Sequence, residues 1–207
     1  MEKKPEFIPT RESLLSRLKD WNDDEGWSEF FTIYRQLIFS TARRAGLCED
    51  EAEDVVQETV LSVAKTIKEF KYDPKKCRFK NWLGHLAQKR IADRFRKRGR
   101  ELPAANSTAN RTGTAPIERV PDPAGADLDA IWEAEWKQKV LDAAMTSVKT
   151  KVNAEQYQIF DFYVLKKMPA AKVAKTLGVS IGQVYLARHR VAAALKKEVR
   201  RIDGELG

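Results

Sequence analysis

Apolar residues recur at every third or fourth position along most of this chain, which is the period of an amphipathic α-helix. A first helix is predicted with Thr10 or Ser13 as its cap, and its apolar stripe consists of Leu14, Leu15, Leu18 and Trp21. A second helix is predicted over residues 26–45, and Gly46 ends it. Its core face consists of Trp27, Phe30, Phe31, Tyr34, Leu37, Ile38, Thr41 and Ala45.

A third helix is predicted to start at a cap formed by Asp50 or Glu49. Its apolar positions are Ala52, Val55, Val56, Val60, Val63, Ala64 and Ile67. Asp73 and Pro74 break the chain, and a fourth helix begins near Lys80. The fourth helix carries Trp82, Leu83, Leu86, Ala87, Arg90 and Phe95. No segment reads convincingly as a strand, so the expected fold class is all-α.

Residues 99–127 contain four prolines and three glycines among many small and polar residues, which predicts an irregular linker. A structureless segment of this length argues for two domains rather than one. We therefore predict a helical domain over residues 10–98, the linker over residues 99–127, and a second helical domain over residues 128–203.

The second domain is predicted to contain a helix-turn-helix. One helix starts near Leu128, and Asn153 caps another that runs to about Leu165. Pro169 suits the first turn of the next helix, Gly178 ends that helix, and Ser180 caps the following one. Away from the apolar stripe, that last helix presents a DNA-facing set, namely Ser180, Gly182, Gln183, Tyr185, Leu186, Arg188, His189 and Arg190. The alternative is a pair of ordinary packed helices with a solvated basic face.

The charge is divided sharply between two neighbouring segments. Residues 75–100 hold eleven Lys or Arg residues and one acid, interleaved with large apolar residues, whereas residues 49–58 hold six acids and no base. The net charge of the whole chain is +8. A basic helix with interleaved aromatics favours a nucleic-acid partner over a merely soluble basic protein. The acidic helix is predicted either to meet a different partner or to be a solvated face.

The sequence gives no sign of catalytic or metal chemistry. Cys48 and Cys77 are far apart and lack the spacing of a zinc site, and His85 and His189 have no recognisable nucleophile partner. The carboxylate pairs around Asp54 have no histidine beside them, so we expect no metal and no cofactor. With no signal peptide or membrane-spanning run, we expect a cytoplasmic protein that is not an enzyme and has no membrane partner.

Residues 50–70, DEAEDVVQETVLSVAKTIKEF, and residues 79–98, FKNWLGHLAQKRIADRFRKR, resemble region 2 of bacterial RNA polymerase sigma factors. Residues 178–196 resemble their region 4. A chain with these two regions and a linker is similar to the extracytoplasmic function (ECF) group of the sigma-70 family. The resemblance implies a protein that binds core RNA polymerase and directs it to promoter DNA. It also admits an anti-sigma factor as a further partner, which the sequence does not identify.

The resemblance assigns residues to each surface. The core-polymerase contact would comprise Asp54, Gln57, Glu58 and Leu61. The minus-ten promoter element would meet Lys80, Trp82, Gln88, Lys89, Arg90, Arg94 and Arg96. The helix-turn-helix set defined above would meet the minus-thirty-five element. The family usually has Asn where this chain has Lys89, and a lysine at that position suits a phosphate.

Two other classes of protein compete with this interpretation. A stand-alone helix-turn-helix regulator would use its first domain to dimerise or to sense a ligand. A nucleic-acid enzyme would need a catalytic constellation, which the sequence does not show. The adjacent acidic and basic helices favour the sigma factor, because a dimeric regulator needs no separate basic and aromatic domain.

Overall fold

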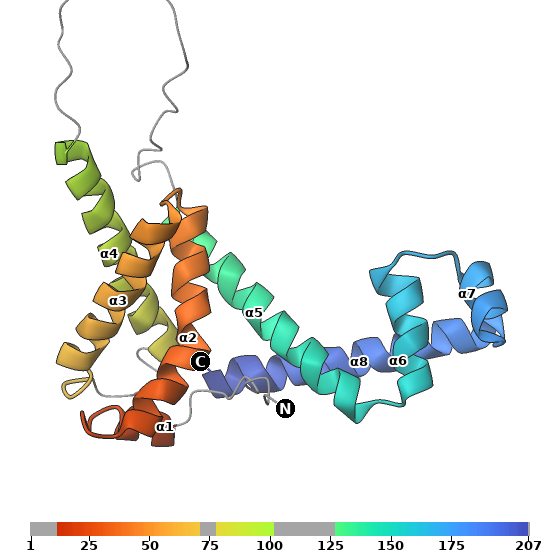
Figure 1. Ribbon diagram of the computed structural model, residues 1–207. Coiled ribbons are helices and arrows are strands. Elements are labelled where there is room, and N and C mark those ends of the chain that lie inside the picture. Colours follow the sequence, from red (N-terminus) through yellow and green to blue (C-terminus); the bar gives the residue numbers. More distant parts are fainter. Residues whose placement is uncertain (1–11, 71–77, 102–126, 207) are drawn as a thin grey trace, which may run out of the picture. The chain divides into compact units, whose positions relative to one another are not determined.

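The computed structural model describes residues 12–70, 78–101 and 127–206 (Figure 1). Every regular element in these ranges is helical, which confirms the predicted all-α fold class. The chain divides into two compact units, one within residues 1–137 and one at Gln138–Leu206. Nearly all of the predicted linker lies outside the described residues, and its first three residues continue a helix that ends at Glu101.

The first unit is built from α1 (Glu12–Arg17), α2 (Asp24–Arg44), α3 (Glu49–Thr66), α4 (Phe79–Glu101) and the start of α5 (Leu128–Lys151). Helix α3 packs against both α2 and α4, as Figure 1 shows. The apolar stripes meet in a core whose largest fully buried side chains include Phe30, Tyr34, Leu37, Ile38, Phe79, Leu83 and Ile91. Gly46 ends the turn after α2 with a φ of 101°, as predicted.

The ends of these helices differ from the prediction in two places. Ser13 lies inside α1 and is not its cap, while Thr10 is outside the described residues. Helix α3 starts one or two residues earlier than expected, with Cys48 as its N-cap in place of Glu49 or Asp50. The reason is a capping box, because the Cys48 backbone N–H donates to the Glu51 carboxylate at 2.9 Å.

Some residues that helical spacing assigned to the core are exposed in the structure. Trp21 lies beyond the end of α1 and is 50% exposed, and Phe31 on α2 is 41% exposed. Leu141 on α5 is likewise exposed. Conversely, Thr59 and Ser62 of α3 are buried although neither belongs to the predicted apolar positions of this helix. A periodic pattern marks one face of a helix, but the neighbouring helices decide how wide the buried part is.

The second unit contains the rest of α5, α6 (Ala154–Phe160), a π-helical turn η2 (Asp161–Leu165), α7 (Ala170–Leu177) and α8 (Ile181–Leu206). The Asn153 carboxamide oxygen caps α6 as predicted, accepting from the Glu155 N–H at 2.8 Å. The predicted helix to Leu165 is instead α-helical only to Phe160 and continues as the π-helical turn. Pro169 is the N-cap of α7 and precedes its first turn.

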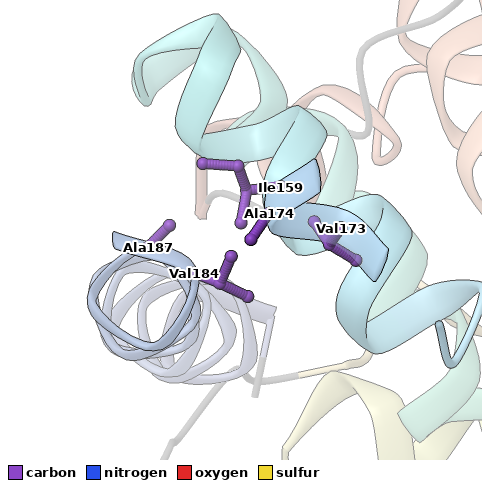
Figure 2. Packing of buried hydrophobic residues seen from close by; sticks show 5 residues of the cluster. All are labelled: Ile159, Val173, Ala174, Val184 and Ala187. Atoms are coloured by element: carbon purple, nitrogen blue, oxygen red, sulfur yellow. The ribbon is translucent and has the colours of Figure 1, made fainter. Parts of the chain in front are cut away.

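The helix-turn-helix prediction matches the geometry of α7 and α8. Gly178 ends α7 in the left-handed conformation, with a φ of 66°. Figure 2 shows Ile159 of α6, Val173 and Ala174 of α7, and Val184 and Ala187 of α8 converging on one apolar cluster. The small side chain of Ala174 lets α7 approach α8. This cluster holds the second helix of the pair so that its opposite side stays exposed.

One buried charge lies in the second unit. Glu198 of α8 is 6% exposed, and its Oε1 accepts from Ser147 Oγ at 2.7 Å, from Lys151 Nζ at 2.8 Å and from Arg201 Nη2 at 2.6 Å. The hydrogen bond from Arg201 is the largest cause that lowers the pKa of Glu198 to about 2. A buried carboxylate with three donors stabilises the packing of α8 on α5 as long as it is ionised.

We expect the stability of this unit to fall in acid. Because the pKa of Glu198 is lower in the folded state than its unfolded value of 4.5, its contribution is present above that value and is lost as the pH falls toward 2. Chemical denaturation between pH 7 and pH 2 should show this loss, and Glu198→Gln should be less stable at pH 7 and less sensitive to acid. The matched control is Glu155→Gln on the exposed surface of α6. Equal pH profiles for Glu198→Gln and the parent would contradict the assignment.

Within the described ranges, no helix is long and apolar enough to cross a membrane.

Candidate nucleic-acid interface

The basic helix α4 buries its apolar residues in the core and exposes a row of polar and charged side chains. Asn81, His85, Lys89 and Arg96 are exposed along one side, at spacings of four, four and seven residues. Trp82, which the resemblance assigns to the minus-ten element, is half-buried. Its ring stacks at 4.6 Å from that of Phe70 and at 5.4 Å from that of Phe79.

Several cations of α4 are paired with α3 or with their own helix. Arg94, 16% exposed, forms an ion pair with Asp54, and Arg98 lies 3.3 Å from the Glu51 carboxylate. Arg90 donates to Ser62 Oγ at 3.1 Å and to Asp93 at 3.2 Å. These contacts hold α4 on α3. They also occupy Arg90 and Arg94, which the resemblance assigns to DNA, and Asp54, which it assigns to the polymerase.

The other side of α4 lies under the start of α5. Lys80 is 9% exposed, its Nζ is 2.6 Å from the Glu133 carboxylate, and it lies 5.1 Å from the centroid of the Trp136 ring. Gln88 Nε2 donates to Asp129 at 2.8 Å. Lys80 and Gln88, both assigned to the minus-ten element by the resemblance, therefore contact the protein itself.

The same part of α5 is anchored by two buried indoles. Trp132 is 3% exposed and Trp136 is 1% exposed, while the buried Glu135 forms an ion pair with Arg44 of α2 at 2.6 Å. A buried indole removes about 150–250 Å² from water, which stabilises the packing by roughly 4–6 kcal/mol as an upper estimate. A single good base contact contributes only about 1–3 kcal/mol. Lys80 and Gln88 could reach DNA only if both indoles were exposed. The packing free energy lost in that change would exceed the free energy gained from the new DNA contacts.

The outer face of α3 combines acids with an exposed apolar residue. Gln57 and Glu58 are exposed, and Leu61 is 54% exposed one turn further along the helix. Glu53 lies beside them but is bonded to Arg35, and Asp54 is bonded to Arg94. Of the four residues that the resemblance assigns to core polymerase, Gln57, Glu58 and Leu61 are thus available to a partner without breaking an ion pair.

Helix α8, the second helix of the helix-turn-helix and therefore its predicted recognition helix, presents its predicted DNA-facing set to solvent. The buried stripe of Val184, Ala187 and Val191 lies against α6 and α7, and the predicted DNA-facing set is exposed, namely Ser180, Gly182, Gln183, Tyr185, Leu186, Arg188, His189 and Arg190. Tyr185 meets Tyr163 edge-on at 5.8 Å. Exposed aromatic and apolar groups at the start of such a helix suit base edges and thymine methyl groups.

Gln183 has a structural task that the sequence reading did not foresee. Its Oε1 accepts from the Ser180 backbone N–H at 2.7 Å, and its own N–H donates to Ser180 Oγ at 3.1 Å. This reciprocal pair is a capping box at the start of α8. The spacing of Ser180 and Gln183 was the signal in the sequence. Because the capping box occupies Gln183 Oε1, the Gln183 side chain is only in part available to a base.

A small groove beside the recognition helix adds a cation that the sequence reading missed. It has a volume of about 440 Å³ and is lined by Tyr163, Val164, Lys167, Met168, Pro169 and Arg188. Lys167 adopts a φ of 53°, a left-handed conformation that places it at the bend before α7. The pair of lysines just before Pro169 was the available signal. Two cations at the rim of a helix-turn-helix suit a DNA phosphate.

No group of three or more metal-ligating side chains gathers anywhere in the described part of the chain. The carboxylates of α3 are instead used in ion pairs with arginines or lie on the exposed face.

Comparison with known proteins identifies the family of the first unit. Residues 30–101, which span most of α2, all of α3 and all of α4, match the model of sigma-70 region 2. The first unit therefore carries a sigma-70 region 2. A relative is the ECF RNA polymerase sigma factor SigW of Bacillus subtilis, which is 21% identical over 178 residues that cover 86% of this chain and 91% of SigW. The similarity to SigW extends through both units.

Among solved structures, CnrH in complex with the cytosolic domain of CnrY aligns with 89% of this chain and 94% of CnrH, at 18% identity and a TM-score of 0.35. The match to sigma-70 region 2 supports a role in transcription initiation. The sigma-70 family consists of transcription initiation factors without a catalytic activity of their own.

Proposed function

We propose that this ECF sigma factor binds core RNA polymerase through α3 and directs it to promoters through α4 and α8. The observation that carries the proposal is the pairing of opposite surfaces on two packed helices. Exposed Glu58 and Leu61 lie on α3, whereas exposed Lys89 and Arg96 lie on α4. A polyanion is repelled by the first surface and attracted by the second, so the two surfaces suit two different partners.

The second unit supports the same proposal. Its recognition helix exposes Tyr185, Leu186 and His189, and Arg188 and Arg190 lie beside them for phosphates. We assign the minus-thirty-five element to this helix and the minus-ten element to α4. The predicted linker over residues 99–127 would join the two DNA contacts. The protein would work in the cytoplasm with the transcription machinery. We also predict an anti-sigma factor that covers one of these surfaces.

Promoter recognition should depend on the polymerase. Each unit offers few phosphate contacts, so the free chain should bind duplex DNA weakly and lose that binding steeply as salt rises. With core polymerase added, promoter fragments should be retained over scrambled fragments in mobility-shift and transcription assays. The control is core polymerase alone. Tight, sequence-specific binding by the free chain as a dimer would instead establish the stand-alone helix-turn-helix regulator.

A further inference from the structure

The start of α5, residues 128–137, lies along one face of α4 and is called the cover below. Lys80, Gly84 and Gln88 are spaced four residues apart, so they form a single stripe on α4. Taken in that order, they contact Glu133 together with Trp136, then Trp132, and then Asp129. All of these residues belong to the first unit. The cover therefore hides one stripe of the basic helix within that unit.

The cover offers α4 the same two kinds of group that a single strand of DNA offers. The Glu133 carboxylate lies 2.6 Å from Lys80 Nζ, so an anionic oxygen already pairs with this cation, as a phosphate oxygen would. The Trp136 ring lies 5.1 Å from the same Nζ, and the Trp132 indole lies on Gly84. These rings are flat aromatic groups, as bases are. A strand of DNA and the cover would therefore compete for this stripe.

The contact is closely packed, but it leaves one buried polar group without a partner. A Cβ atom at Gly84 would lie 2.8 Å from Trp132 Nε1, so the indole lies directly on the α4 backbone. Within the described residues, this buried Nε1 has no hydrogen-bond partner. An unpaired buried N–H lowers the stability of the closed contact, and it regains a partner in water when the cover leaves. This feature favours displacement of the cover by a competing partner.

The reach of the chain requires that the cover leave α4 in a promoter complex. The minus-ten and minus-thirty-five elements are about 25 base pairs apart, which is on the order of 85 Å along straight DNA. The second unit starts at Gln138, directly after the cover, and its longest helix, α8, measures about 39 Å over 26 residues. The ten residues of the cover add about 15 Å. With the cover in place, α8 cannot reach the upstream element while α4 holds the minus-ten element.

We propose that the cover occupies the minus-ten surface of α4 in the free chain and leaves it when the chain joins core polymerase on a promoter. This inference rests on the proposed function and adds the step that makes promoter binding depend on the polymerase. DNA contacts alone do not release the two buried indoles of the cover. Core polymerase shifts the equilibrium because it binds the open chain, in which the second unit can reach the upstream element, more tightly than the closed chain.

A crosslink tests whether the cover has to leave. Gln88→Cys and Asp129→Cys are introduced together into full-length protein in which Cys48 and Cys77 are replaced by serine, and a short reducible reagent joins the two new thiols. The crosslinked form should initiate transcription with core polymerase about tenfold more slowly than the same protein after reduction. The comparison of two forms of one protein cancels the effect of the substitutions. The Asp129→Cys single variant, treated with the same reagent, controls for the modification itself.

The crosslink experiment separates this inference from the proposed function. Equal rates for the crosslinked and the reduced forms would overturn the inference, because α4 and α8 would then work with the cover in place. Failure of the parent protein and of the reduced form to bind core polymerase would refute the proposed function instead.

Removing the carboxylates of the cover tests the same contact without polymerase. Asp129→Asn with Glu133→Gln should let the free chain bind a single-stranded minus-ten oligonucleotide about tenfold more tightly, because each substitution removes an anion that competes with phosphate at α4. Asp24→Asn with Glu69→Gln is the matched control, since it makes the same change of net charge at two exposed positions of the same unit. The control pair should gain much less affinity. An equal gain in both pairs would show that only net charge matters and would contradict a cover on α4.

Discussion

Replacing Glu58 by lysine and Leu61 by serine together should weaken the binding of core polymerase about 100-fold. Both side chains are exposed on the same face of α3, and neither forms an ion pair within the described residues. A central apolar anchor at an interface contributes about 2 kcal/mol, and a reversed charge adds about 1 kcal/mol or more. The sum of about 3 kcal/mol corresponds to roughly two decades in Kd.

Asp54 is a poor choice for the same test, although the sequence alone recommended it. Its ion pair with Arg94 joins α3 to α4, so reversing its charge would place two cations side by side where these helices meet. Any loss of polymerase binding would then be mixed with a loss of stability. Glu58 and Leu61 avoid this problem, because substitutions at exposed positions usually change stability by less than about 0.5 kcal/mol.

The affinity should be measured by titrating labelled full-length protein with core polymerase. Glu69→Lys is the matched control, since Glu69 is exposed just beyond the end of α3 and undergoes the same change of charge. The thermal unfolding of the double variant should equal that of the parent. If the double variant binds core polymerase as tightly as the parent, the outer face of α3 is only a solvated surface.

Tyr185→Ala and His189→Ala should each flatten the preference for the minus-thirty-five element about 10-fold to 100-fold. Both side chains lie in the first turns of α8 and point away from the buried Val184 and Val191. A productive contact with a base edge contributes about 1–3 kcal/mol of discrimination, which corresponds to this range. Transcription from promoters varied only in the upstream element measures the effect.

Arg190→Ala is the control for this experiment. Arg190 is exposed on the same helix, and an arginine that contacts phosphate should affect all promoters by nearly the same factor. Gln183→Ala should differ from both kinds of variant, because it also removes the capping box with Ser180 and costs about 0.5–2 kcal/mol of stability. A uniform loss for Tyr185→Ala and His189→Ala would place the sequence preference elsewhere, in α4 or in DNA shape.

The local part of this protein is determined by the sequence. The three- and four-residue spacing of apolar positions gives the helices, and Asn153 and Gly178 act as the cap and the stop that their chemistry predicts. The exposed side of α8 also follows from its sequence, since the apolar stripe of Val184 and Val191 fixes which residues are left outside. These features depend on residues that are close together in the chain.

Tertiary structure alone decided which charged side chains remain available to a partner. Arg94 and Asp54 lie on different helices, as do Lys80 and Glu133, and nothing in their local sequence pairs them. The pairing arises because α3 packs against α4 and because the start of α5, separated from α4 by residues 102–126, returns to lie on Gly84. The charges can be counted from the sequence, but whether a charge is neutralised depends on its distance from an opposite charge. Residues far apart in the chain come within that distance only when the packed helices bring them together.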